Sequence, residues 1–456
     1  MAVAERIGFT QEAFDAFLSE RDEPGWLTDA RRAAWQRFEQ LETPGRRDEE
    51  WTRTDIRAFQ LDAYGLPTKK GSGLFFEIEG DAATSAAARK RGLTPFSGLL
   101  AAGVELGGSA GGVDSQGAEG WLDEGLAGKG VLFGSLERVV AEHGQRLRPY
   151  FQRPIVDPTQ DKFAALHAAC WCGGTLLYVP KGVRAEAPLH ALSTMTDGGV
   201  DLGKTLVILD EGAEATLLCE AASTSPTGGG LHCGSVEIVV GPHARLRYVN
   251  LQNWGSGVWH FAHQRAVVDR GGQLQWTIGA LGSRLAKVNQ RVAMAGPDAH
   301  VQVNGVMFTE GRQHLAYHTH QHHQAPHCHS DLLYKTALQD QARTVWRGMI
   351  KVDEEAQRTD AYQRNDNLML SPNARADSIP GLEIEADDVR CTHGSTSGRV
   401  DDEQVFYAMG RGYTRKEAVR MIVAGFFQQV FDRITIESVR DALGQAIGRR
   451  VRDIEE

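Results

Sequence analysis

The chain has 456 residues, of which 41% are hydrophobic and 24% charged, a composition typical of a globular protein with room for two or three domains. Its net charge of -10 argues against nucleic acid or an anionic membrane as a partner. No apolar run approaches the roughly 20 residues of a membrane span, and the first residues do not resemble a secretion signal. Six cysteines are too sparse for a disulfide scaffold, so we expect a cytoplasmic protein with reduced thiols.

Residues 1–150 are predicted to form an N-terminal helical and irregular domain. Apolar residues recur at helical spacing between positions 5 and 60, and Pro24-Gly25 and Pro44-Gly45 interrupt them. The Gly/Ser-rich stretch 103–120 is predicted to be a mobile loop. Residues 134–150 predict another helix.

From residue 151 to 398 the pattern changes to short strands, which predicts a mainly β core. A turn-forming or charged residue followed by a small residue precedes several strands, at irregular intervals, as in a parallel β-solenoid with unequal turns. A jelly roll or another sandwich is the alternative. The expected strands are 175–179, 205–209, 215–218, 236–240, 246–251, 266–268, 274–278 and 301–306, and the small residues are Ala213, Ala244, Gly272, Ala299, Ala342, Ala356 and Ala374.

Residues 399–456 return to helical spacing and are predicted to form a C-terminal helical domain. Thr414 and Glu417 form a capping-box pattern at the start of a long helix. The apolar face of that helix is broader than packing on one neighbouring helix requires, which is compatible with a partner surface. The residues predicted to bind a partner are Val419, Ile422, Phe426 and Phe427.

One motif resembles a nucleotide site. Residues 198–205 match the phosphate-binding pattern G-x-x-x-x-G-K-[ST]. That loop needs a helix directly after it, whose N-terminus holds the phosphates, whereas here Lys204 and Thr205 lead into a strand pattern. The sequence therefore predicts no ATP binding at this motif.

Three groups of residues could ligate a metal. Cys391 and His393 lie two apart on a predicted strand, so they can present a thiol and an imidazole on one face. A His-rich segment is a second, weaker candidate; within it His318, His320 and His322 would share a face if it is extended, and its candidate ligands are His318, His323, His327 and Cys328. Cys170 and Cys172 are interpreted as buried thiols in a strand.

The chain resembles the SufB/SufD family of iron–sulfur cluster assembly proteins over nearly its whole length. The resemblance rests on motifs that occur in one order: GGT at 173–175, YVPKGV at 178–183, His318-Thr319, Pro326-His327-Cys328, Asn367-Leu368, the stretch from Asp388 to Gly394, and Phe406-Tyr407. Within the family it is more similar to the SufD branch. The cluster-building cysteine of SufB is absent, because Asn365 stands at the position that we assign to it, and Cys391 and His393 stand where SufB has glutamates.

The resemblance implies a right-handed parallel β-helix between two helical domains. It also implies a non-catalytic scaffold that pairs with a SufB paralogue and docks the ATPase SufC on the C-terminal helices. His393 carries over as the metal-site histidine, and with Cys391 it would share a transient iron–sulfur cluster or iron with the partner. No tightly bound cofactor is expected on the chain alone, although reduced flavin could take part in the complex. His320, His322 and His329 exceed the family pattern.

Two other functions are compatible with the sequence. A metal-dependent β-solenoid enzyme would use the His-rich segment as its metal site. A carbohydrate-binding solenoid is disfavoured because no regular ladder of aromatic residues follows the strands.

Overall fold

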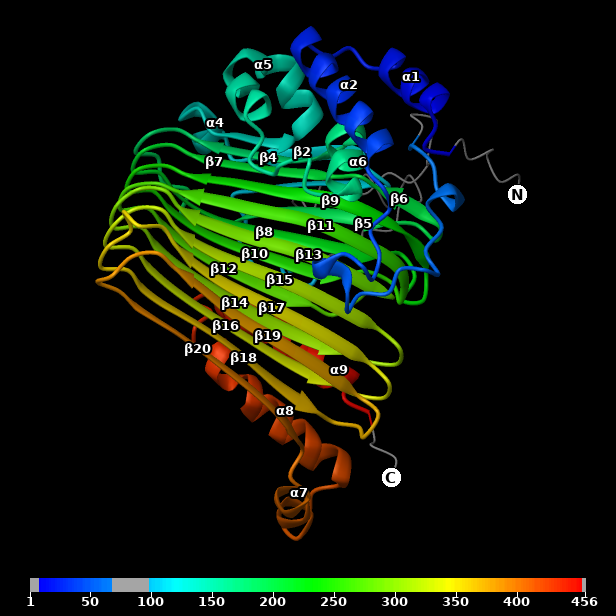
Figure 1. The fold of residues 1–456 in the computed structure, drawn as a ribbon, viewed down its shortest axis with the longest axis vertical. Helices are drawn as coiled ribbons and strands as arrows, with labels where there is room; N and C mark the ends of the chain where they lie inside the picture. The colour runs from blue at the N-terminus through cyan, green and yellow to red at the C-terminus, as the bar shows by residue number, and fades with distance from the viewer. Residues whose placement is uncertain (1–7, 68–97, 453–456) are drawn as a thin grey trace.

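The computed structural model describes residues 8–67 and 98–452, and its core is a parallel β-solenoid with helices at both ends (Figure 1). The chain runs alternately through two long sheets. Within each sheet, a strand of the core pairs in parallel with the strands of the preceding and the following turn. This arrangement confirms the predicted solenoid. Parallel pairing throughout the core rules out the jelly roll, whose strands would be antiparallel.

Each sheet is a continuous ladder along the solenoid. Sheet A has the order β2 (Gln116–Leu122), β1 (Gly108–Val113), β5 (Leu189–Met195), β8 (Glu214–Ser223), β10 (Arg245–Asn253), β12 (Gln273–Ala280), β14 (His300–Thr309), β16 (His329–Leu338), β18 (Asp360–Met369) and β20 (Arg390–Arg399). Sheet B has the order β19 (Arg375–Ile384), β17 (Arg343–Val352), β15 (His314–His323), β13 (Leu285–Met294), β11 (Gly257–Val268), β9 (Gly229–Val240), β7 (Lys204–Leu209), β4 (Gly174–Val179) and β3 (Leu132–Ser135), and β6 (Gly199–Asp201) also pairs with β9.

The small residues of the turn signature sit where the chain bends from one sheet into the other. The backbone N–H of Ala213 donates to the carbonyl of Asp210 at 3.0 Å, and Gly212 between them has a φ of 67°. Ala213 and Ala244 are fully buried, so their methyl groups face the interior. A larger side chain would overpack these fully buried positions, which explains why the small residue recurs.

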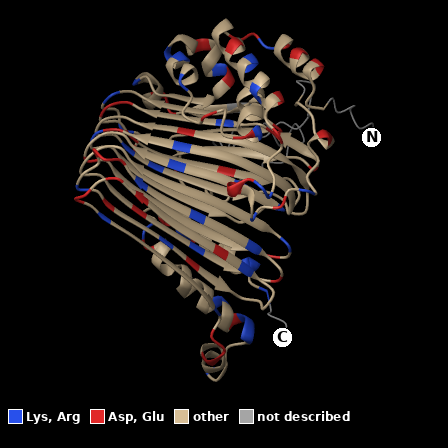
Figure 2. Ribbon diagram, in the orientation of Figure 1, with Lys and Arg blue, Asp and Glu red and all other residues tan. Residues whose placement is uncertain are grey.

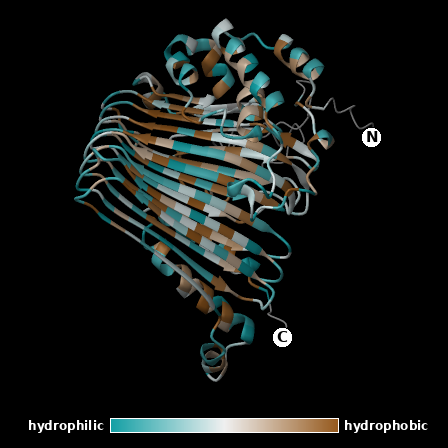
Figure 3. Cartoon of the chain, in the orientation of Figure 1, coloured by the Kyte–Doolittle hydropathy of each residue, from teal (hydrophilic) through white to brown (hydrophobic). Residues whose placement is uncertain are grey.

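Inside the solenoid, the inward side chains of both sheets form one apolar cluster that includes Tyr248, Trp276 and Ile278. Figure 3 shows the resulting alternation of hydrophobic and hydrophilic residues along the strands. Period-two alternation of this kind is expected where only one face of a strand is buried in a core.

The N-terminal end of the solenoid is covered by helices (Figure 1). These are α1 (Gln11–Ser19), α2 (Gly25–Gln40), α4 (Glu124–Gly128), α5 (Leu136–Gln152) and α6 (Lys162–Cys170), with short 3-10 turns η1 (Glu49–Trp51) and η2 (Leu61–Ala63) between α2 and β1. The predicted break at Pro24-Gly25 and the predicted helix at 134–150 are confirmed, since α2 begins at Gly25 and α5 covers most of that range.

The prediction of a mobile loop at 103–120 is wrong. Strands β1 and β2 in this stretch form an antiparallel hairpin that joins sheet A. Its glycines are there because the two backbones come close: a Cβ on Gly112 would lie 2.5 Å from the carbonyl oxygen of Gln116. Asp114 and Ser115 occupy the tight turn with φ values of 46° and 64°, as a two-residue hairpin turn requires.

Cys170 and Cys172 are buried, as predicted, but they do not lie in a strand. Cys170 ends helix α6, and Cys172 follows in the loop before β4. Helix α6 is buried on almost every side, so its sequence lacks the one-sided apolar stripe of a surface helix.

Three strands before residue 150 pair within the solenoid sheets, and the division into domains at 150 and 398 stays a prediction.

The C-terminal helices are α7 (Asp402–Met409), α8 (Arg415–Phe431) and α9 (Glu437–Arg450). The predicted capping box is present, because the Thr414 side chain accepts from the Glu417 backbone and the Glu417 side chain accepts from the Thr414 backbone. Helix α8 packs on the outer face of β14 and β16, while α7 stands beyond the solenoid in Figure 1. Among the described helices, none is long and apolar enough to cross a membrane.

The two ends of the solenoid differ. At the N-terminal end, antiparallel strands and the helical layer cover the first turns. At the other end, sheet A stops at β20 and sheet B stops at β19, and within the described chain neither strand has a partner on its outer edge. Solenoids need such ends to be capped or paired, because an open strand edge is a template for another strand.

Candidate functional site at the open end of the solenoid

The register of the last turn places Cys391 and His393 on the inner face of β20. Cys391 lies beside Ala361 of β18 and His393 lies beside Gln363. Ala361 and Gln363 are buried in the solenoid interior. Because paired residues of neighbouring strands point to the same face of a sheet, Cys391 and His393 also face the interior. The prediction that the thiol and the imidazole share one face is confirmed. Cys391 is half-buried and His393 is exposed, because β20 is the final rung.

Below this pair lies a polar layer in the last complete turn. The Asn367 side chain donates to Oδ1 of Asn365 at 2.8 Å and to the hydroxyl of Ser378 on β19 at 3.0 Å. Asn365 is fully buried, and its Nδ2, like Oε1 of Gln363, has no hydrogen-bond partner within the described residues. Buried polar atoms normally have partners. The open end is therefore built to receive polar groups rather than to be closed by an apolar cap.

Sequence reasoning missed this polar layer. Its signal was the period-two spacing of Gln363, Asn365 and Asn367, which places three amides on one face of a strand. Asn365, which stands where the SufB branch has its cluster-building cysteine, is one rung below the open edge and faces the interior beside Ser395.

The Cys391 thiol is held in its protonated form. Partial burial and the negative charge of Asp360 raise the pKa of Cys391. Because the thiolate is the metal ligand, binding of a metal there must release a proton.

We expect iodoacetamide to alkylate Cys391 alone in the native chain. The other cysteines, Cys170, Cys172, Cys219, Cys233 and Cys328, are buried. Since the pKa of Cys391 is raised, its labelling rate should be low at pH 7 and should still increase above pH 8.5, where an unperturbed thiol is already half ionised. Mass spectrometry of the labelled chain measures this, and rapid labelling of the Cys391→Ser variant would contradict it.

The histidines of the His-rich segment do not form one site. His314, His318, His320 and His322 occupy alternate positions of β15 on the outer face of sheet B, as predicted for a shared face. His323 points inward and bonds to the Ser330 hydroxyl at 2.8 Å. His327 lies in a turn with a φ of 62°, and the Cys328 thiol donates to the carbonyl of Gly296. The proposed set His318, His323, His327 and Cys328 is thus divided among three environments.

Two of the outer histidines, His318 and His320, lie close to cations. His318 Nδ1 accepts from Lys287 Nζ at 2.8 Å, and burial together with Lys287 lowers the pKa of His318 to about 2. Burial and Arg291 lower the pKa of His320 to about 4. Figure 2 shows Lys and Arg recurring on successive strands of the solenoid. Within residues 8–67 and 98–452, the His, Cys, Asp and Glu side chains form no group of three or more that could hold a metal ion.

The phosphate-loop pattern at 198–205 lies in a strand context, as predicted. Gly199–Asp201 form β6, and Lys204 begins β7 rather than a helix. The Lys204 ammonium is buried and lies 2.5 Å from Glu237. Neither a helix N-terminus nor a free ammonium is available there for phosphates.

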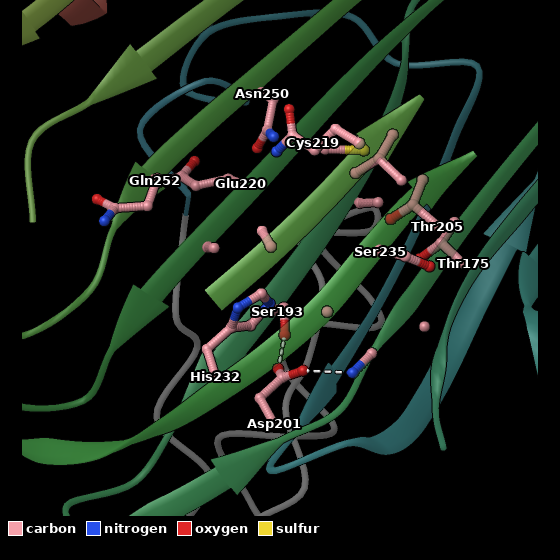
Figure 4. A pocket seen from close by; sticks show the side chains of 18 of the residues that line it. Thr175, Ser193, Asp201, Thr205, Cys219, Glu220, His232, Ser235, Asn250 and Gln252 are labelled. Carbon is pink, nitrogen blue, oxygen red and sulfur yellow. Dashed lines mark hydrogen bonds between the residues drawn. The ribbon is translucent and has the colours of Figure 1, made fainter. Parts of the chain in front are cut away.

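A small polar cavity lies inside the solenoid near its N-terminal end (Figure 4). Ser193 donates to Asp201, and the His232 and His260 rings meet at 2.7 Å between their Nδ1 atoms. Burial lowers the pKa of both imidazoles, so they are neutral. The cavity volume is about 100 Å³, which suits ordered water rather than a substrate.

The predicted partner-binding residues of α8 differ in accessibility. Val419 and Phe427 are buried in a cluster with Val306, Phe308 and Leu333 of the solenoid's outer face. These two residues are therefore wrong as contacts for another protein, because they hold α8 on its own solenoid; Ile422 and Phe426 are half-buried. The exposed apolar side chains of the C-terminal segment lie instead on α7, in the turn between α7 and α8, and on α8: Phe406 (77%), Tyr407 (64%), Met409 (44%), Tyr413 (46%) and Met421 (48%).

These features define a β-solenoid protein with one covered end and one end that no strand of the described chain pairs with, where a thiol and an imidazole lie on the inner face of the last strand. The family model described as "SUF system FeS cluster assembly, SufBD core domain" matches residues 192–426. The chain belongs to this family of iron–sulfur cluster assembly proteins.

Similar proteins carry the same description. An iron–sulfur cluster assembly SufBD family protein of Staphylococcus epidermidis is 29% identical over 317 residues, which are 69% of this chain and 68% of the relative. The iron–sulfur cluster assembly protein SufB of Bacillus subtilis is 26% identical over 436 residues, 94% of this chain and 90% of the relative. The match to SufB is therefore longer than the region matched by the family model.

Proposed function

We propose that this chain is the SufD-type scaffold subunit of an iron–sulfur assembly complex, without catalytic activity of its own. The observation that carries the proposal is the open end of the solenoid, where both sheets end in strands that have no outer partner among the described residues. Strands β19 and β20 are partly or fully exposed along their lengths, whereas the strands before them are mostly buried. A SufB-type paralogue with the same solenoid would extend the open end, chiefly at β20 of sheet A.

The joint between two such solenoids is where a cluster would be held. A four-iron cluster needs about four ligands, and the open end offers Cys391 and His393. The partner would supply the remaining donors, so iron or a nascent cluster would be shared and the isolated chain would bind it weakly. Reduced flavin would enter, if at all, through the assembled complex.

Affinity purification of the tagged chain from its native cell, followed by identification of the bound proteins, tests the proposal. A SufB-type paralogue and a SufC-type ATPase should be recovered in stoichiometric amounts. Recovery of the chain with neither protein, under conditions that preserve other Suf complexes, would refute the assignment.

The exposed apolar side chains of α7 and early α8 are the proposed dock for the ATPase. Replacing Phe406 and Tyr407 by glutamate should abolish co-purification of a SufC-type ATPase, because large apolar anchors contribute on the order of 2 kcal/mol each. Both side chains are mostly exposed, so the thermal stability of the chain should not change. Phe427 is unsuitable for this test because it is fully buried.

The matched control is Trp121→Glu, which changes an exposed aromatic residue of the β1–β2 hairpin at the other end of the solenoid. Its effect on ATPase binding should be negligible. Unchanged binding by the Phe406/Tyr407 variant would show that the ATPase docks elsewhere.

A further inference from the structure

A basic pocket lies on the outer face of sheet B, on the side where the strands of that sheet begin. One wall is the segment between η1 and η2, which Figure 1 shows as a blue loop over sheet B. The residues that give the pocket its character are Asp55 and Arg57 of this segment, Trp259 of β11, Arg284 and Leu285 at the start of β13, and Arg312 before β15. The pocket volume of about 490 Å³ falls within the range of small-molecule sites.

The lining of this pocket is positively charged, although the chain as a whole has a net charge of -10. Within the described chain, Arg57, Arg284 and Arg312 line the pocket together with one carboxylate, that of Asp55. His314 also lines it, and burial together with Arg343 lowers the pKa of His314 to about 4, so this imidazole is neutral at pH 7. Three guanidiniums and one carboxylate leave two positive charges without a counter-charge in the lining.

Asp55 does not offer its charge to the rest of the pocket, because both of its oxygens are occupied. Arg57 Nε donates to Oδ1 at 3.0 Å, and Arg57 Nη2 donates to Oδ2 at 2.7 Å. Arg46 Nη2 also donates to Oδ2, at 2.8 Å. The hydrogen bonds from Arg57 and the charge of Arg46 lower the pKa of Asp55, so the carboxylate stays ionised between two arginines. This group of three therefore remains net positive.

Arg284 and Arg312 are the cations that a ligand can reach. Both are exposed, and neither forms an ion pair with a described residue. The Cζ atom of Arg284 lies 4.9 Å from the centroid of the Trp259 ring, and Arg312 Nε donates to Gln341 Oε1 at 3.2 Å. A guanidinium has five N–H donors, so each of these two arginines keeps donors for an anion.

The turn before Arg284 is held in place by buried glutamines. Ser283 has a φ of 80°, and its carbonyl accepts from Gln313 Nε2 at 3.0 Å. Gln252 Nε2 donates to the carbonyl of Gly282 at 3.0 Å. The position of Arg284 at the pocket is therefore fixed by the turn, and only its side chain has to adjust to a ligand.

The turn that carries Arg312 is also fixed, and the acidic residues around it have partners. The N–H of Gly311 donates to Asp340 Oδ2 at 2.7 Å. Glu310 lies 2.6 Å from Arg452, and Arg452 also lies 3.8 Å from Asp340. These carboxylates are therefore already neutralised, and the charge of Arg312 remains available to a ligand.

This arrangement favours a phosphate ester over a carboxylate. A phosphate monoester carries close to two negative charges at pH 7 and three strong acceptor oxygens, which match the two uncompensated charges and the guanidiniums from three different segments. A carboxylate has one charge and two oxygens in one plane, so it suits a single arginine. Trp259 and Leu285 add an apolar part to the lining, on which an organic group can lie.

We propose that this pocket binds a small phosphate monoester. The phosphate oxygens accept from Arg284 and Arg312, Arg57 adds its positive charge beside them, and the organic group lies on Leu285 and Trp259. This binding site is separate from the open end of the solenoid and does not depend on the scaffold role.

Isothermal titration calorimetry of the full chain at low ionic strength, where screening is weak, tests this proposal. The probes are phenyl phosphate and glycerol 3-phosphate, one aromatic and one aliphatic monoester, and at least one of them should bind saturably at one site. The comparison ligand is benzoate, which has the ring of phenyl phosphate but carries a carboxylate. Benzoate should bind at least about tenfold more weakly than phenyl phosphate, because it has half the charge and fewer acceptors.

Arg284→Ala and Arg312→Ala should each weaken binding of the monoester by about tenfold or more. Both side chains are exposed, so the melting temperature should change little. The matched control is Arg247→Ala, which removes an exposed arginine from β10 of sheet A and changes the net charge equally. The proposal is overturned if neither monoester binds saturably, if benzoate binds as tightly as phenyl phosphate, or if Arg247→Ala weakens binding as much as the two pocket variants.

Discussion

Replacing Ser395 by proline is expected to weaken pairing with a SufB-type partner by more than about tenfold while the isolated chain stays folded. The expectation follows from the direction of the backbone groups in β20. The N–H of Arg390 donates to Thr359 and the N–H of Val400 donates to Met369, so even-numbered residues bond back toward β18. The odd-numbered residues therefore direct their N–H and C=O groups toward the open edge.

Proline at 395 removes one of these outward donors and places a ring at the edge. It removes no bond between β20 and β18, so the stability of the isolated chain should change by less than about 1 kcal/mol. Analytical size exclusion of the co-expressed pair measures the association, and thermal unfolding of the isolated chain measures the stability.

Ser395→Ala is the matched control because it removes the same hydroxyl but keeps the N–H. It should pair normally. If the proline variant also pairs normally, the partner does not extend sheet A, and the joint must be formed by side chains or by the C-terminal helices alone.

The other open strand already carries a proline. In β19 the odd-numbered residues bond back to β17, since the N–H of Arg375 donates to Ala342 and that of Glu385 donates to Val352. Pro380 is even-numbered, so the donor that it lacks would have pointed to the open edge. Proline is tolerated there for that reason and limits strand addition on sheet B. We therefore place the main backbone pairing at β20.

The solenoid could be predicted because its turns repeat a local physical requirement. A residue that turns the chain, a small buried residue and a β-branched or apolar run recur at each bend, and each is visible in the sequence. The β1–β2 hairpin could not be predicted in the same way. Its glycines are needed for close approach of two backbones, and a Gly/Ser-rich sequence looks the same in a flexible linker.

The candidate site was predicted only in part. Two residues at a spacing of two must share a face, so the Cys391/His393 pair followed from the sequence. The sequence did not show that this face of β20 continues the solenoid interior, or that β20 is the last strand of its sheet. Both facts depend on the pairing of β20 with β18, whose residues lie 30 positions earlier in the sequence. The prediction that Val419 and Phe427 of α8 contact a partner failed for a related reason. Whether these residues pack on another protein or on their own solenoid depends on contacts with the distant strands β14 and β16.

His393→Ala is expected to leave the complex intact but to reduce cluster build-up on it by roughly tenfold or more, since loss even of a group that supports a metal ligand costs 10–100-fold. His393 is exposed on the inner face of the last rung, and its side chain has no hydrogen bond or ion pair to the part of the chain that the structure describes. Its removal should therefore affect metal binding and not assembly. Size exclusion reports the assembly, and visible absorbance with iron and sulfide content reports the cluster.

Two further variants make the result specific to this histidine. Cys391→Ser should have a smaller effect, because the raised pKa of the thiol makes it the weaker donor at neutral pH until a cation approaches. His320→Ala, on the outer face of sheet B, should be nearly neutral. Normal cluster assembly by the His393 variant would show that this imidazole is not a ligand. A defect confined to the His320 variant would instead place the metal on β15, where a metal-dependent enzyme would need it.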